Sequence, residues 1–161
     1  MPMIEGGRRA SGLQFAVVVS RYNDFVTDRL LAGAREGLES GGVAAADVTV
    51  LRVPGAYEIP IAAQRAAETG RFAAVVALGC LIRGATPHFD YIASAVSHGL
   101  TAAAAATGVP IAFGVLTTNS AEEAIERVGP GAANKGWEAA VAAIEMATLF
   151  QALEASERSS A

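Results

Sequence analysis

The chain alternates short apolar, β-branched runs with longer segments in which apolar residues recur at helical spacing, and this alternation constrains the fold most strongly. The expected strands are 15–20, 48–53, 73–80 and 110–117. The expected helices are 25–40, 58–69, 88–107, 121–127 and 134–153. Strands that are each followed by a helix pair in parallel through right-handed crossovers. The pattern therefore predicts an α/β fold, a three-layer α/β/α sandwich around a four-stranded parallel sheet.

The length of 161 residues fits one domain. We expect residues 13–155 to form it, with 1–12 as an N-terminal tail or edge segment and 156–161 as a C-terminal tail. Hydrophobic residues make up 52% of the chain and charged residues 17%, which is more apolar than a typical soluble monomer. Because a small domain has limited interior volume, this surplus predicts extensive contacts between identical subunits.

Charge and targeting signals exclude several classes of protein. The net charge of -4 and the pI near 5.2 argue against a nucleic-acid binder. The longest apolar run, 72–82, is too short to cross a bilayer as a helix, and the N-terminus lacks the apolar stretch of a signal peptide. The single cysteine, Cys80, cannot form an intrachain disulfide. We therefore expect a cytoplasmic protein that binds neither nucleic acid nor membrane.

Parallel sheets bind ligands at the carboxyl ends of their strands. This rule selects four segments, which hold most of the unusual chemistry of the chain: 20–25, 53–60, 79–90 and 116–120. One of them places the turn 84–86 between a buried strand and a helix that begins near His88, with Arg83 beside it. Backbone N–H groups of such a turn and the positive end of the helix favour a phosphate. The spacing matches neither a P-loop nor a dinucleotide motif, so a small phosphorylated metabolite fits best, unless these residues only shape the turn.

His88 is a candidate general base. In the first turn of a helix the dipole disfavours the imidazolium, so the neutral ring can accept a proton near neutral pH. A single histidine is more often structural, and both readings stay open here. His98 does not lie three or four positions from His88, and neither histidine has clustered carboxylates nearby, so we expect no metal site.

Three further side chains each allow a functional and an ordinary interpretation. Tyr22, after the first strand, offers a flat face for a heterocycle, or is a partly buried aromatic residue. Glu58 begins a helix, where the dipole favours its carboxylate and where it could also reach ligand hydroxyls. Lys135 is the only lysine among 12 cationic residues. Either this position requires a compact ammonium group, or the single lysine is there by chance.

Four motifs carry a resemblance to a known family. They are VPGAYEIP at 53–60, GCLIRGATPHFDYI at 79–92, PIAFGVLTT at 110–118 and NKGWEAA at 134–140. In this order and spacing they resemble the lumazine synthases, over about residues 15–153. The resemblance implies a transferase that condenses 5-amino-6-(D-ribitylamino)uracil with 3,4-dihydroxy-2-butanone 4-phosphate. The products are 6,7-dimethyl-8-ribityllumazine and inorganic phosphate, in the penultimate step of riboflavin biosynthesis and without a cofactor.

The resemblance also implies roles for individual residues. His88 would transfer protons, and Tyr22 would be the platform under the pyrimidine, where family members more often have Phe or Trp. The other substrate-binding residues would be Ala56, Tyr57 and Glu58 at the ribityl chain and ring edge; Cys80, Leu81 and Ile82 along the pyrimidine; Gly84, Ala85, Thr86 and Arg127 around the phosphate; Lys135 at the phosphate or the intermediate; and Phe113 from a neighbouring subunit. Cys80 is then a lining residue and not a nucleophile.

The assembly that the resemblance implies is a pentamer, with twelve pentamers packed into a hollow icosahedral shell of 60 subunits. The compact turn GPGAANKG at 129–136 and the short N-terminal segment are similar to those of shell-forming members. Riboflavin synthase is a further candidate partner.

Two other functions remain to be weighed. One is a structural shell or a ligand-binding module, such as a flavin carrier, with little catalysis; the combination of His88, Arg127 and Lys135 argues against it. The other is an electron carrier, because the expected three-layer topology is flavodoxin-like. The turn at 21–25, RYNDF, lacks the Ser/Thr/Gly-rich phosphate loop that such a carrier would need.

Overall fold

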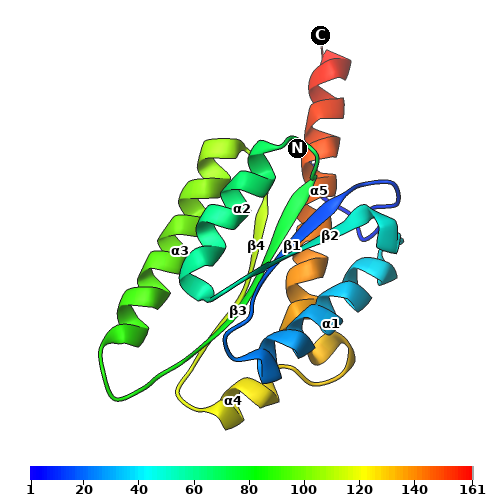
Figure 1. Cartoon of the computed structure of the whole chain (residues 1–161). Helices are drawn as coiled ribbons and strands as arrows, with labels where there is room; N and C mark the ends of the chain where they lie inside the picture. Colours follow the sequence, from blue (N-terminus) through cyan, green and yellow to red (C-terminus); the bar gives the residue numbers. More distant parts are fainter. Residues whose placement is uncertain (161) are drawn as a thin grey trace.

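The computed structural model describes residues 1–160 and places one parallel sheet between two layers of helices (Figure 1). The strands are β1 (Phe15–Ser20), β2 (Val48–Val53), β3 (Ala74–Ile82) and β4 (Ile111–Thr118). Their order in the sheet is β2-β1-β3-β4, and every pair is parallel. This confirms the predicted α/β/α sandwich with a four-stranded parallel sheet and a flavodoxin-like topology.

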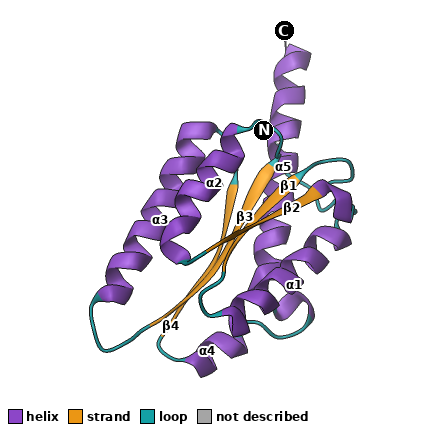
Figure 2. Cartoon of the chain, viewed as in Figure 1, coloured by secondary structure: helices purple, strands orange, loops and turns teal. Residues whose placement is uncertain are grey.

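The helices divide between the two faces of the sheet (Figure 2). They are α1 (Asp24–Ser40), α2 (Ile59–Glu68), α3 (His88–Thr107), α4 (Ala121–Glu126) and α5 (Lys135–Ser160), with 3-10 turns η1 (Ala45–Asp47), η2 (Ala56–Glu58) and η3 (Gly131–Ala133). Helices α1 and α5 pack together on one face, and α2 and α3 pack together on the other. In β1, Val17 faces the first layer and Val18 the second, so the strand is buried on both sides. This explains its continuous apolar run.

Several element boundaries differ from the predictions, and two of these differences have a clear physical reason. Strand β3 does not end at Cys80 but continues to Ile82, because its last residues pair with Thr117 and Thr118 of β4 even though they are only half-buried. The predicted helix 58–69 begins as the 3-10 turn η2 and becomes α-helical at Ile59. Ser120 caps α4, since its Oγ accepts the N–H of Glu123 at 3.2 Å.

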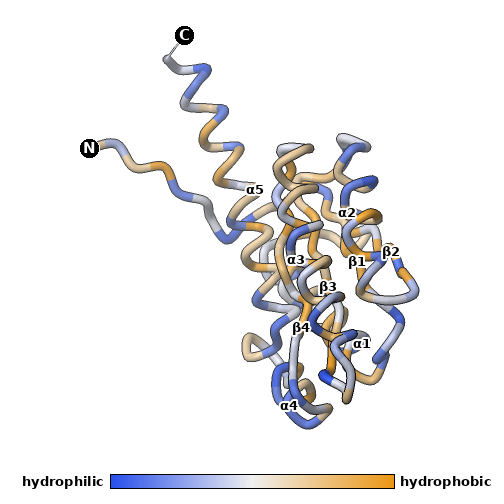
Figure 3. Tube along the Cα trace, turned by 90° about the vertical axis from the view of Figure 1, so that its left-hand side faces the viewer, coloured by the Kyte–Doolittle hydropathy of each residue, from blue (hydrophilic) through white to orange (hydrophobic). Residues whose placement is uncertain are grey.

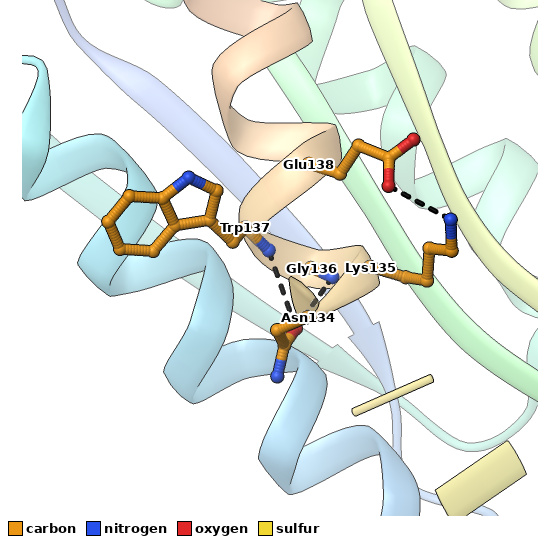
Figure 4. A network of polar contacts seen from close by, with 5 residues as sticks. All are labelled: Asn134, Lys135, Gly136, Trp137 and Glu138. Atoms are coloured by element: carbon orange, nitrogen blue, oxygen red, sulfur yellow. Dashed lines mark hydrogen bonds and ion pairs between the residues drawn. The ribbon is translucent and has the colours of Figure 1, made fainter. Parts of the chain in front are cut away.

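Asn134 joins the start of α5 to α1 (Figure 4). Its buried Oδ1 accepts the N–H of Gly136 at 2.7 Å and that of Trp137 at 3.4 Å, while its Nδ2 donates to the Arg29 carbonyl at 3.1 Å. These bonds satisfy donors at the helix start and fix α5 against its neighbour. Much of the NKGWEAA motif is therefore structural.

Both ends of the chain extend from the body (Figure 3). Helix α5 continues past the predicted end to Ser160, and its last turns project beyond the sheet (Figure 1). Near the N-terminus, Gly7 donates its N–H to Thr148 Oγ1 of α5 at 2.8 Å, and the residues before it are mostly exposed. Among residues 1–160, α5 is the one helix long and apolar enough to cross a membrane. Its buried stripe, which includes Ala140 and Ile144, packs into the core beside α1.

Candidate active site

A cavity of about 710 Å³ lies at the carboxyl ends of β1, β2 and β3. It forms at the point where the strand order reverses, because the chain passes from β1 to β2 on one side and to β3 on the other. Nine residues that the sequence singled out line it: Tyr22, Ala56, Tyr57, Glu58, Leu81, Ile82, Gly84, Thr86 and His88. Its size suits a small organic ligand.

The loop after β1 supplies one wall of the cavity. Tyr22 is 72% exposed, and its backbone N–H donates to the Pro54 carbonyl at 3.0 Å. The next residue, Asn23, also lines the cavity and donates its Nδ2 to the Cys80 carbonyl at 2.9 Å. Sequence reasoning missed Asn23. Its signal was the residue type, because asparagine tolerates the left-handed backbone that a tight strand-to-helix turn often needs.

The segment 53–60 supplies a second wall. Ala56 is buried in the core on the α2 side, whereas Tyr57 is exposed and Glu58 is half-buried at the start of α2. The Glu58 N–H donates to the Gly55 carbonyl at 3.2 Å, which closes the turn. Pro60 lies in the first turn of α2, where its missing N–H has no cost. The motif thus turns two side chains outward and leaves a small residue at the floor.

The end of β3 forms the third wall. Leu81 and Ile82 line the cavity, whereas the Cys80 side chain is buried in the core on the α1 side. Burial raises the pKa of the Cys80 thiol to about 11, so the thiol is protonated at neutral pH and is a poor nucleophile. Only the backbone of Cys80 can therefore contribute to this wall.

The turn between β3 and α3 is exposed from Gly84 to His88, and Gly84 and Thr86 line the cavity while Ala85 lies between them. Helix α3 begins at His88 without a side-chain cap. The Asp90 and Tyr91 N–H groups donate to the Pro87 carbonyl, which leaves those of His88 and Phe89 for an anion. His88 itself is exposed and faces this space.

His98 lies elsewhere on α3, with its ring nitrogen 2.9 Å from the Ser94 carbonyl. No group of three or more metal-ligating side chains gathers within residues 1–160.

Arg83 is held beside the cavity rather than in it. Its Nε donates to Asn119 Oδ1 at 3.2 Å, its NH1 lies 3.2 Å from an Asp90 carboxylate oxygen, and its guanidinium stacks over the Phe89 ring at 4.4 Å. The sequence placed Arg83 near the anion turn, and the structure turns its guanidinium toward α3 and the loop after β4. It therefore braces the turn from the outside.

Five of the predicted residues do not line the cavity: Cys80 and Ala85 adjoin it, and Phe113, Arg127 and Lys135 lie away from it. Phe113, 53% exposed, and Lys135 line a separate hollow of about 270 Å³ between β4 and α5. Arg127 lies beside them, because the Lys135 N–H donates to the Arg127 carbonyl at 2.9 Å. The Lys135 ammonium pairs with the Glu138 carboxylate at 3.0 Å (Figure 4), and the Arg127 guanidinium donates to the Glu123 carbonyl at 2.7 Å. One chain thus carries the predicted residues on two separate surfaces.

Comparison with known proteins decides the family. The profile of the 6,7-dimethyl-8-ribityllumazine synthases matches residues 12–151. A 6,7-dimethyl-8-ribityllumazine synthase of Syntrophus aciditrophicus (strain SB) is 53% identical over 152 residues, which cover 94% of this chain and 99% of that protein. The chain belongs to the lumazine synthase family.

As a lumazine synthase, the chain is a transferase of riboflavin biosynthesis. It condenses 5-amino-6-(D-ribitylamino)uracil with 3,4-dihydroxy-2-butanone 4-phosphate to form 6,7-dimethyl-8-ribityllumazine, as the resemblance implied. The family match sets aside the electron carrier, which shares only the topology. Besides Asn23, the lumazine synthase cavity has lining residues that sequence reasoning did not single out: Pro54, Gly55, Phe89 and Ile92.

Proposed function

We propose that the cavity at the strand ends binds the two substrates side by side. The pyrimidine lies on Tyr22 and against the backbone of Leu81 and Ile82, and the ribityl chain runs toward Glu58. The phosphate of the second substrate binds at the turn 84–86 and the first N–H groups of α3. One observation carries this proposal: a flat aromatic face, a strand-end wall and an open helix start line one hollow.

The chemistry requires little beyond this placement. The amine of the pyrimidine adds to the ketone carbonyl and loses one molecule of water to form an imine. Elimination then releases phosphate, and ring closure by the ribityl-bearing nitrogen on the remaining carbonyl carbon expels a second molecule of water. Holding two reactants in contact converts a bimolecular step into one within a complex, and this contributes most of the acceleration. Proton transfer by His88, at the edge of the cavity, is a secondary contribution.

His88→Ala should therefore lower kcat by about 10²-fold without abolishing turnover. The remaining activity comes from positioning, which this substitution leaves intact. The measurement is steady-state formation of the fluorescent lumazine by the correctly assembled variant. A complete loss of turnover in an assembly of wild-type size would contradict this division of roles.

We further propose that a neighbouring subunit completes each site. Phe113 lies in β4, Arg127 directly after α4 and Lys135 at the start of α5, all away from the cavity of their own chain, whereas a second copy could bring them to it. The apolar surface supports such contacts: a cavity of about 390 Å³ between the end of α3, the start of β4 and α5 is lined by residues such as Ile111, Met146 and Phe150. Exposed apolar area of this kind marks protein contact sites.

The pentamer is the assembly that the resemblance implies, and we propose it for this chain, packed into a shell of 60 subunits. The 3-10 turn at Gly131–Ala133 keeps the connection before α5 compact, which favours the shell. Light scattering distinguishes a free pentamer from the 60-subunit shell by mass. Riboflavin synthase as a partner and the cytoplasmic location stay predictions.

Arg127→Ala tests the phosphate role. A guanidinium binds phosphate through charge-assisted hydrogen bonds, so its loss should raise the KM for the phosphorylated ketone by about 100-fold. The KM for the pyrimidine should change far less, because that substrate has no phosphate. Initial rates with each substrate varied in turn give both constants. Equal effects on both would refute the assignment of Arg127 to the phosphate.

The overall test is direct. The purified protein is incubated with both substrates, and lumazine fluorescence and released phosphate are followed together. Equal amounts of the two products support the proposed reaction. Binding of a pyrimidine without any product would favour the ligand-carrier alternative.

A further inference from the structure

Asn23 has an unusual backbone conformation at the edge of the cavity. Among residues 1–160 it is the one non-glycine residue with a positive φ, 63°, together with a ψ of 45°. A left-handed backbone is sterically unfavourable for residues with a Cβ, although asparagine tolerates it better than most. Such a conformation persists where the surrounding structure imposes it, and it occurs often at functional sites.

The Asn23 side chain is also used in an unusual way. The residue stands at the N-cap of α1, where an asparagine side chain ordinarily accepts an N–H of the first helical turn. Asn23 makes no such cap bond. Its Nδ2 donates instead to the Cys80 carbonyl at 2.9 Å, across the opening between β1 and β3. The Asn23 side chain therefore bonds to strand β3 and does not cap α1.

This contact lies where two paired strands separate. The pairing of β1 with β3 ends at Val19 and Leu78, and β3 then continues to Ile82 with β4 as its partner. No further residue pair joins β1 to β3 beyond that point, and the cavity opens there. The Asn23–Cys80 hydrogen bond connects the two sides of this opening.

The same contact fixes the place of Tyr22. Tyr22 is 72% exposed, so packing within the chain does little to hold its ring, and the position of the ring depends on the backbone. That backbone is bound to Pro54 on one side through the Tyr22 N–H and to β3 on the other through Asn23. The hydrogen bond to Cys80 therefore sets the distance between the aromatic face and the wall formed by Leu81 and Ile82.

We infer that Asn23 is a positioning residue, whose amide bridge to the Cys80 carbonyl holds Tyr22 and the β3 wall at the spacing of a flat pyrimidine ring. The inference rests on the proposed function, because it assigns that slot to the pyrimidine. Asn23 acts here through Tyr22 and β3 and is not itself a proton donor or acceptor in the reaction.

Two substitutions separate the bridge from the backbone conformation. Asn23→Gly keeps the left-handed conformation, which glycine adopts freely, but removes the amide. Asn23→Asp keeps the size of the side chain and a residue type that tolerates positive φ, but replaces the N–H donor with a carboxylate oxygen that faces the Cys80 carbonyl. If the hydrogen bond to Cys80 is what matters, both variants should bind the pyrimidine more weakly.

The expected result is a split between the two substrates. In both variants the KM for the pyrimidine should rise about tenfold, as expected for the loss of one positioning hydrogen bond, while the KM for the phosphorylated ketone stays within about twofold. A direct binding titration with 6,7-dimethyl-8-ribityllumazine should show the same weakening. Light scattering and circular dichroism verify assembly and folding, since a merely structural defect would lower the amount of active protein without separating the two KM values.

Wild-type kinetics for the pyrimidine in Asn23→Gly would overturn the inference, because only the backbone conformation would then matter. Equal increases in both KM values would also overturn it, because the bridge would then support the whole site and not the pyrimidine slot. If the wild-type protein itself forms no lumazine, the proposed function fails before Asn23 is tested. A failure of the proposed function and a failure of the inference about Asn23 therefore give different results.

Discussion

Two variants that are each nearly inactive should restore activity when their chains assemble together. The first variant, Tyr22→Ala with His88→Ala, disables the cavity at the strand ends. The second, Phe113→Ala with Arg127→Ala, disables the surface near β4 and α5. If each site takes its cavity from one chain and its second surface from the next, neither pure assembly holds a complete site. At substrate concentrations below KM, each should keep at most about a hundredth of the wild-type rate.

The size of the recovery follows from random assembly. In a ring built from equal amounts of both chains, a site has an intact cavity with chance one half and an intact neighbouring surface with chance one half, so about a quarter of the sites are complete. Both chains are co-expressed, their ratio is verified by mass spectrometry, and lumazine formation is measured per chain. The two pure assemblies, mixed after they have formed, are the control. A co-assembly no more active than this control would show that each chain completes its own site.

Gly136→Ala should lower the free energy of unfolding by about 2 to 3 kcal/mol, the upper part of the range for overpacking a buried contact. Gly136 is buried at the first turn of α5, and an added Cβ would overlap the backbone carbonyl of Leu30 in α1. A backbone oxygen cannot rotate away as a side chain can. The two helices would have to separate where Asn134 joins them.

Gly129→Ala is the matched control for this change. No atom lies within 4 Å of a Cβ placed at Gly129, so the free energy of unfolding should change by less than about 0.5 kcal/mol. Urea unfolding of both variants is compared at one fixed protein concentration, because assembly adds to the apparent stability. If Gly136→Ala and Gly129→Ala unfold at the same urea concentration, the contact between α1 and α5 is more adaptable than its geometry indicates.

The layers of the fold were predictable because burial on both faces leaves a clear trace in the sequence. The run in β1 is apolar at every position from Phe15 to Val19, and all of these side chains are buried. Element ends were harder to predict, because they depend on other forces. The end of β3 follows its pairing with β4, and the last turns of α5 are largely exposed, so little apolar periodicity marks them. Their residues are good helix formers, which is a weaker signal.

The cavity could be predicted in part. The motifs at 53–60 and 79–92 each follow a parallel strand, so the carboxyl-end rule placed Glu58 and His88 at one edge of the sheet. The role of Asn23 could not be predicted this way, because it depends on where β1 and β3 separate in space. The separation of Lys135 from the cavity likewise follows from the packing of α5 on β4.

The burial of Cys80 has a practical consequence for labelling. The chain has no other cysteine, and this thiol is enclosed and protonated at neutral pH, so thiol-directed dyes should react with it slowly. A cysteine introduced on an exposed face would then be the single fast-reacting position, with no need to replace the native residue. Donor- and acceptor-labelled preparations could report by energy transfer whether subunits migrate between assemblies.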